Sequence, residues 1–126
     1  MDNVLFDPNT LSITAVLDWE ASLPDSLPFD MIHFLVSEKR MTISENWGEL
    51  LAMLACGNLF DDDDRNLMKR YHEAVGFEDS LFQPFIFAYW ARGVAVRLQR
   101  SGGLLQPVWR RENLVKPLEV FSNLIS

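Results

Sequence analysis

The sequence is poor in cysteine, in basic residues and in long apolar runs, and each scarcity excludes a class of protein. The single cysteine, Cys56, excludes an intrachain disulfide, so a reducing compartment is expected. No apolar run approaches the ~20 residues of a transmembrane helix, and no basic-then-apolar signal peptide opens the chain. We therefore expect a cytoplasmic protein that is soluble and has no membrane partner.

Basic residues are outnumbered by acidic ones, 11 Lys and Arg against 18 Asp and Glu, which gives a net charge of −7. A chain with this balance repels phosphate backbones and anionic lipid surfaces. Nucleic acid is therefore not an expected partner. The acidity is compatible with a cationic substrate such as an amine, although many cytosolic proteins are equally acidic.

The chain is long enough for one domain with a modest core, and we treat residues 1–126 as a single domain. Hydrophobic residues make up 48% of it, and nine Phe and four Trp indicate a well-filled interior or a surface that meets another lobe. Two parts are expected, a hairpin over residues 1–20 and a helical subdomain over residues 28–126.

The start of the chain has the pattern of a β-hairpin. Residues 4–6 form a short apolar run, Asp7-Pro8-Asn9 suits a tight turn, and apolar residues alternate with others from 11 to 17. Antiparallel pairing would bring Asn3, which enters the first strand, beside Asp18, which leaves the second. An amide oxygen and a carboxylate held together form a hard-oxygen site suited to Mg²⁺.

The rest of the chain has helical periodicity. Apolar spacing and end signals predict five helices, over residues 29–36, 42–55, 61–75, 80–100 and 111–125. The helix over 80–100 is apolar nearly all round and is expected to be central, with Gly93 marking close packing against a neighbour. Pro117 is expected to kink or split the last helix. The predicted fold class is α+β, mainly α: an N-terminal β-hairpin followed by about five helices.

Two short motifs flank the predicted hairpin, Asn3-Val4-Leu5 before it and Leu17-Asp18-Trp19-Glu20 after it. This arrangement resembles the aminoglycoside phosphotransferase and choline kinase-like family of small-molecule kinases, which are distant relatives of protein kinases. Members carry a catalytic loop of the form His-Gly-Asp-x-x-x-x-Asn, a short hairpin, and then Ile-Asp-Trp/Phe-Glu. The resemblance implies the C-terminal lobe of a protein-kinase-like fold.

The resemblance also implies roles for three residues, and the spacing of the chain adds a fourth candidate. Asn3 and Asp18 would hold the Mg²⁺ that accompanies ATP, and Asp30 would accept hydrogen bonds from the catalytic-loop backbone as structural support of the site. Glu20, two residues beyond Asp18 on an extended chain, faces the same way and is a third metal-site candidate that orients water. The alternatives are a turn residue for Asn3, a solvated loop acid for Glu20, and a first-turn acid complementing the helix dipole for Asp30.

The sequence departs from the family pattern at its start. The catalytic Asp of the family would lie five residues before Asn3, ahead of Met1, and the chain offers neither a glycine-rich loop nor a phosphate-clamping Lys. We therefore expect the C-terminal part of an ATP-dependent phosphotransferase that acts on a hydroxyl of a small molecule. Alone it is expected to have no activity, and to meet either a missing N-terminal lobe or a second copy of itself.

Other interpretations remain. The first is a non-catalytic helical module that binds a partner, and the second is a metal-dependent hydrolase, which is disfavoured because no His accompanies Asp18 and Glu20 at ligand spacing. The acidic run over residues 61–64 is better explained by helix capping than by metal binding. Cys56 is expected to be a buried small hydrophobe, His33 a hydrogen-bonded helix residue, and His72 a surface residue.

Overall fold

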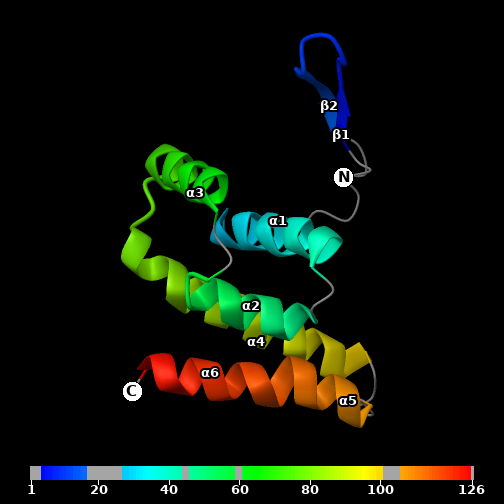
Figure 1. The fold of residues 1–126 in the computed structure, drawn as a ribbon, viewed down its shortest axis with the longest axis vertical. Helices are drawn as coiled ribbons and strands as arrows, with labels where there is room; N and C mark the ends of the chain where they lie inside the picture. The colour runs from blue at the N-terminus through cyan, green and yellow to red at the C-terminus, as the bar shows by residue number, and fades with distance from the viewer. Residues whose placement is uncertain (1–3, 17–26, 44–45, 59–60, 101–105, 126) are drawn as a thin grey trace.

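The computed structural model describes residues 4–16, 27–43, 46–58, 61–100 and 106–125, and it is mainly helical with a two-stranded hairpin at its start (Figure 1). The α+β, mainly α class is therefore confirmed. The elements are β1 (Val4–Phe6), β2 (Ile13–Val16), α1 (Leu27–Thr42), α2 (Trp47–Ala55), α3 (Asp62–Val75), the 3₁₀ helix η2 (Asp79–Leu81), α4 (Phe82–Arg100), α5 (Pro107–Arg110), the π-helical η3 (Arg111–Val115) and α6 (Lys116–Ile125).

The predicted hairpin is present, with β1 and β2 antiparallel and Val4 paired with Val16 at its open end. The Asp7 carboxylate accepts a 2.8 Å hydrogen bond from the Asn9 amide, as the turn prediction requires. The connection is wider than a tight turn at Pro8-Asn9, because the Asp7 amide donates to the Ser12 carbonyl at 2.9 Å and the chain turns through four residues between them.

The hairpin stands apart from the helices in Figure 1. Two of its apolar side chains are largely exposed, Leu11 at 76% and Ile13 at 69% of their surface. Single exposed apolar residues are ordinary, but two on one short hairpin give it an uncovered apolar surface.

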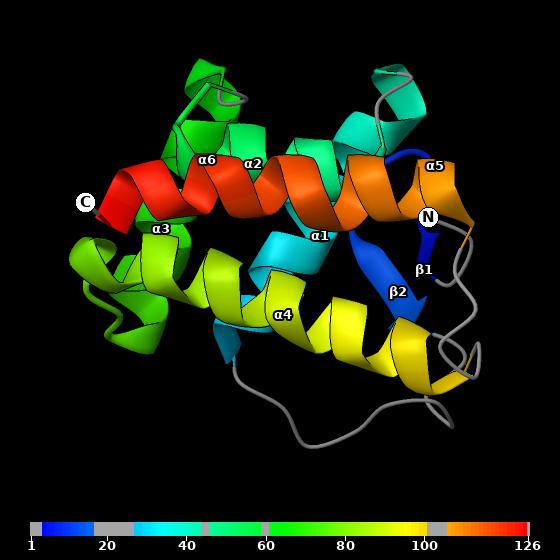
Figure 2. The same ribbon diagram turned by 90° about the horizontal axis from the view of Figure 1, so that it is seen from below.

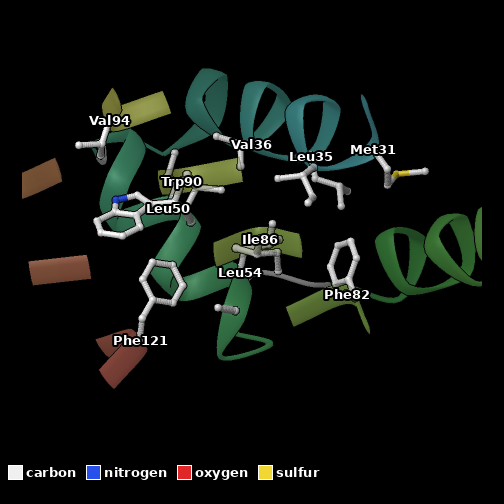
Figure 3. Close-up of a cluster of buried hydrophobic side chains, with 13 residues drawn as sticks. Met31, Leu35, Val36, Leu50, Leu54, Phe82, Ile86, Trp90, Val94 and Phe121 are labelled. Carbon is white, nitrogen blue, oxygen red and sulfur yellow. The ribbon is translucent and has the colours of Figure 1, made fainter. Parts of the chain in front are cut away.

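Helix α2 lies at the centre of the helical part, against α1, α4, η3 and α6. Leu50, Leu51 and Leu54 on α2 are buried against Ile32 and Leu35 of α1 and against the apolar stripe of α4 (Figure 3). The prediction that residues 80–100 form the central helix is wrong. Helix α4 buries one stripe at four-residue steps, and leaves part of its opposite side exposed. The buried residues of α4 are Phe82, Ile86, Trp90 and Val94, and the partly exposed ones include Phe87, Val96 and Leu98.

The predicted helix over residues 42–55 begins too early. Thr42 ends α1, where its hydroxyl donates a 3.1 Å hydrogen bond to the Lys39 carbonyl, and α2 begins at Trp47 after Asn46. Thr and Ser bond to nearby carbonyls as readily as they cap the start of a helix. The sequence alone therefore did not show whether Thr42 ends one helix or begins the next.

The last three helical segments are continuous along the chain, so α5, η3 and α6 form one rod that runs beside α4 (Figure 2). Ring contacts join this rod to α4, with the Phe121 ring centroid 5.2 Å from that of Trp90 and 5.5 Å from that of Phe87. The rod starts at Pro107, earlier than the predicted residue 111, and the predicted interruption near Pro117 takes the form of the π-helical turn.

Two predictions about single side chains are wrong. His72 is buried, where its Nδ1 contacts the Asp79 carboxylate and its ring lies between Phe77 and Phe82. Cys56 is exposed, because it caps the end of α2 one residue after the last buried position.

None of the helices in the described ranges is long and apolar enough to cross a membrane.

Candidate functional site

The three predicted metal-site residues, Asn3, Asp18 and Glu20, lie outside the described residues. What the structure does give is the hairpin register. Val4 pairs with Val16 at the open end, and from that end the chain continues to Asn3 on one side and toward Asp18 on the other. The donor set is one amide and two carboxylates, all hard oxygen ligands, which fits Mg²⁺ and not a softer metal.

Asp30 lies in the first turn of α1 and is exposed. An acid at this position complements the positive end of the helix dipole, which is the simpler of its two interpretations. Burial and then the negative charge of Asp30 raise the pKa of Tyr71. The predicted support of a catalytic-loop backbone involves residues outside those described, so it stays a prediction.

The acidic run at the start of α3 serves the helix. The Asp61 carboxylate accepts from the Asp64 amide at 2.9 Å, and the Asp64 carboxylate accepts from the Asp61 amide, which completes a capping box. The Asp64 amide is the main cause that lowers the pKa of Asp61, and Lys39 of α1 reinforces it. Because the Lys39 ammonium lies 2.7 Å from Asp64 and 3.3 Å from Asp61, these carboxylates already have their cation. In the described ranges, this acidic run included, no group of three or more His, Cys, Asp or Glu side chains could hold a metal ion.

A cleft of about 590 Å³ opens on another side of the helical part. It lies where the end of α1, the start of α2, the end of α4 and the α5–η3 junction meet. We call it the arginine cleft, after its lining residues Arg40, Arg97 and Arg100, which stand with His33, Trp47 and Trp109.

The arginine cleft is strongly cationic in an acidic protein. Its lining residues include three arginines and no carboxylate among those the structure describes. Within the same described residues, Arg40, Arg97 and Arg100 form no ion pair, whereas Lys39 and Lys116 each contact two or more carboxylates. The Arg97 guanidinium lies 5.8 Å from the ring centre of Trp109, at cation–π distance.

One wall of the cleft depends on a glycine. A Cβ at Gly93 of α4 would lie 2.4 Å from the Trp47 ring, far inside van der Waals contact. The absence of a side chain at Gly93 therefore lets the Trp47 indole pack closely against α4. The prediction that Gly93 marks close packing is confirmed.

Asn113 of η3 lines the cleft, and its side chain joins η3 to α2 and α5. Its Oδ1 accepts a 2.9 Å hydrogen bond from the Gly48 amide at the start of α2, and its Nδ2 donates to the Trp109 carbonyl at 3.2 Å. A Cβ at Gly48 would lie 2.6 Å from Asn113 Cα, so only glycine permits this approach. π-helical turns are frequent at functional sites, and this one presents a buried amide to another helix.

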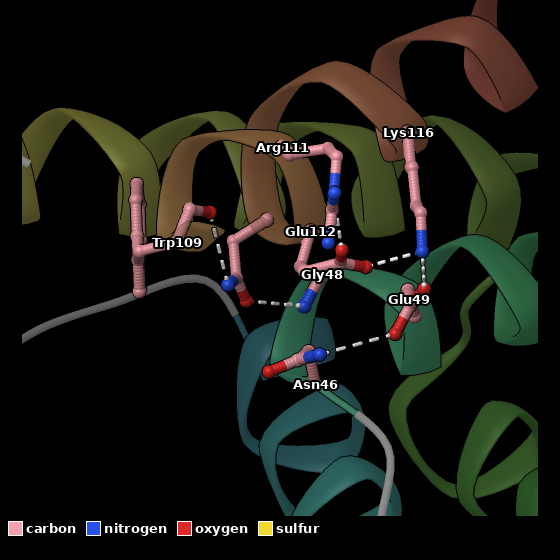
Figure 4. Close-up of polar contacts among 8 residues, drawn as sticks. Asn46, Gly48, Glu49, Trp109, Arg111, Glu112 and Lys116 are labelled. Carbon is pink, nitrogen blue, oxygen red and sulfur yellow. Dashed lines mark hydrogen bonds and ion pairs between the residues drawn. The ribbon is translucent and has the colours of Figure 1, made fainter. Parts of the chain in front are cut away.

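A network of ion pairs also links α2, η3 and α6 (Figure 4). Lys116 contacts Glu112 of η3 and lies 2.6 Å from Glu49 of α2, while Arg111 lies 2.6 Å from Glu112. Glu112 and then Glu49 raise the pKa of Lys116. Glu49 and Glu112 are thus paired with Lys116 and Arg111, and among the described residues no ion pair joins either carboxylate to an arginine of the cleft.

His33 and Tyr89 meet at one side of the cleft. His33 Nδ1 lies 2.7 Å from the Tyr89 hydroxyl, and Ser37 Oγ lies 3.4 Å from His33 Nε2. Burial raises the pKa of Tyr89, partly offset by a contact with Trp47, so the phenol stays protonated at neutral pH. His33 is a hydrogen-bonded helix residue, as predicted.

Sequence analysis did not identify Arg40, Arg97 or Arg100. The available signal was basic residues in the last turns of α1 and α4, but basic residues are common at helix ends because they complement the dipole. Only the packing of α1 and α4 brings them to one cleft.

No family model, curated protein or solved structure matches the chain, so its function is inferred from its own residues.

Proposed function

We propose that the chain is the C-terminal part of an ATP-dependent small-molecule phosphotransferase, which transfers the γ-phosphoryl group of ATP to a hydroxyl of its acceptor. One observation carries this proposal beyond the sequence motifs. β1 and β2 are antiparallel, and beyond a register shift between Leu5 and Phe6 they pair up to the open end, where Val4 lies opposite Val16 and from which the chain continues to Asn3 and toward Asp18. A helix in place of β2 would have separated the two motifs.

Phosphoryl transfer depends on positioning and on electrostatic stabilisation more than on covalent chemistry of the protein. The chemistry that Mg²⁺ would supply when bound is neutralisation of the negative charge on the phosphates of ATP. In this proposal Asn3 and Asp18 hold the metal through oxygen atoms and Glu20 orients water around it. Asp30 supports the backbone beside the site, and the helices supply the wall that receives the acceptor.

The coding DNA immediately upstream of Met1 tests the proposal. In the family pattern the catalytic Asp precedes Asn3 by five residues, so an in-frame His-Gly-Asp segment is expected to end at that position. The longer product should phosphorylate a small hydroxyl compound in the presence of Mg²⁺ and ATP. The isolated 126-residue chain should not, because it lacks the catalytic Asp and a nucleotide clamp. An in-frame stop directly upstream, or unrelated codons at that position, would overturn the proposal.

A second candidate function is a non-catalytic helical module that binds a partner. The observation that favours it is the uncovered hairpin, on which Leu11 and Ile13 are the most exposed apolar residues. A phosphotransferase cleft would also leave this surface open until its other lobe covers it. The upstream sequence separates the two, because a module needs no catalytic loop ahead of Asn3.

A further inference from the structure

We propose that the arginine cleft binds a small organic oxyanion, namely a phosphate or carboxylate group carried on a planar or apolar body. The inference rests on the cleft alone and does not depend on the phosphotransferase proposal. It also differs from the cationic substrate with which the net charge of the chain is compatible. The local arrangement of charge decides which ligand a cleft attracts, because water and salt screen charges beyond about 10 Å.

The arginines supply the first argument. Arg40 comes from α1, and Arg97 and Arg100 come from α4, yet all three line one cleft without a carboxylate among its described lining residues. Each residue is in the last turn of its helix or near it, where a cation also complements the dipole. Complementing the dipole explains why each arginine lies at a helix end, but it does not explain why all three line the same cleft. Guanidinium groups bind phosphate and carboxylate oxygens through paired hydrogen bonds, because their planar arrangement of N–H donors matches the spacing of these oxygens.

The start of α2 supplies the second argument. Asn46 and Trp47, the N-cap and first residue of α2, both line the cleft. The Asn46 side chain makes no capping hydrogen bond to the helix, and its Nδ2 donates instead to Glu49 at 3.2 Å. The positive end of a nine-residue helix therefore opens on the same space as the arginines. The Gly48 amide is already bonded to Asn113, so the contribution of this end to anion binding is that of the helix dipole.

The aromatic walls indicate the rest of the ligand. The Trp47 and Trp109 rings and the Tyr89 hydroxyl border the cleft, and its 590 Å³ is the size of a pocket for a small organic molecule. Gly93 fixes the place of Trp47, and Asn113 holds the carbonyl of Trp109. Because these walls are aromatic and are held in place by contacts within the protein, they favour a ligand with a planar or apolar body over a bare ion.

Calorimetric titration with four probes tests the inference. Phenyl phosphate and benzoate carry the two oxyanions on the same ring, inorganic phosphate lacks the ring, and phenol lacks the charge. At least one aryl anion should bind at least about tenfold more tightly than both inorganic phosphate and phenol, and binding should weaken with salt. The comparison of phenyl phosphate with benzoate assigns the oxyanion. Absence of binding by both aryl anions up to about 10 mM, or equal binding of inorganic phosphate, would overturn the inference.

Charge-removing variants locate the site. Arg40→Gln and Arg100→Gln should each weaken binding of the aryl anion by about tenfold or more, as expected for loss of a charge-assisted hydrogen bond. Arg70→Gln removes the same charge from an exposed position on α3 and should leave the affinity unchanged. Equal weakening by all three substitutions would mean that the anion responds only to net charge. As a check on the intact protein, the indole NMR signals of Trp47 and Trp109 should shift on binding, and unchanged signals would place the ligand elsewhere.

Discussion

The indole nitrogen of Trp90 donates a 2.9 Å hydrogen bond to the backbone carbonyl of Asn113. In an α-helix that carbonyl would accept from the amide of residue 117, but Pro117 has no amide hydrogen to give. Trp90, from α4, therefore satisfies a carbonyl that the proline leaves free. With the Gly48 amide on Asn113 Oδ1, the peptide and side chain of one residue join α2, α4 and η3.

Asn113→Ala should destabilise the fold by about 2 kcal/mol, because it leaves the buried Gly48 amide without an acceptor. Urea unfolding of the variant and the parent chain measures the difference. Asn66→Ala, on the exposed side of α3, is the control and should change the stability by less than about 0.5 kcal/mol. Equal effects of the two substitutions would mean that the Asn113 bonds contribute nothing net.

Gly93→Ala should destabilise the protein by about 1–3 kcal/mol, although alanine is the better helix former. The reason is the 2.4 Å approach of the new Cβ to the Trp47 ring, which forces the indole out of place. The same substitution in a Trp47→Leu background should lose most of this cost, and the double-mutant cycle measures the coupling. Gln99→Ala on α4 is the control for helix propensity. An unchanged cost in the Trp47→Leu background would show that another contact opposes the Cβ.

Acid should weaken the link between α1 and α3. The Asp64 amide, and secondarily Lys39, lower the folded-state pKa of Asp61 below its ordinary value of 3.8. The stabilisation by Asp61 is therefore fully present above pH 3.8 and is lost as the pH falls through the lower folded-state value. The difference in unfolding free energy between the parent chain and Asp61→Asn should accordingly shrink as the pH is lowered through this range. Asp63→Asn, which leaves the capping box intact, should not show this dependence.

The hairpin should mediate self-association of the isolated chain, because Leu11 and Ile13 expose apolar surface away from the helices. Sedimentation velocity at rising concentration should show a dimer or larger species, and Ile13→Glu should shift it toward the monomer. Val108→Glu is the matched control, since Val108 is 62% exposed but lies on α5. A monomer at all concentrations, or an equal effect of both substitutions, would contradict this expectation.

The parts of the fold that the sequence predicted are those with local causes. The Asp7 turn bond and the Asp61 cap depend on neighbours in the chain, and both are present. The central position of α2 could not be predicted in this way. The short helix from Trp47 to Ala55 is central because α1, α4, η3 and α6 pack around it, whereas the longer α4 has more apolar residues but buries only one stripe of them.

The two candidate sites differ in the same respect. The Asn3–Asp18 hypothesis came from motifs and hairpin periodicity, and the structure bears on it through the register of Val4 and Val16. The arginine cleft came only from packing, because Arg40 is 57 positions before Arg97 and nothing in either local sequence points to the other. A tertiary site whose residues each have an ordinary local role leaves no sequence signal.

The most direct measurement of the proposed metal site is paramagnetic broadening by Mn²⁺, a substitute for Mg²⁺, in the NMR spectrum of the ¹⁵N-labelled chain. The account predicts that the amides of Val4 and Val16, at the open end of the hairpin, broaden before those of Asn9 and Thr10 at its loop. Asp18→Asn should abolish this broadening. Asp7→Asn, which removes a carboxylate from the loop end, should preserve it. Broadening that persists in Asp18→Asn, or that occurs only at the acidic start of α3, would contradict the metal site and with it the proposed phosphotransferase.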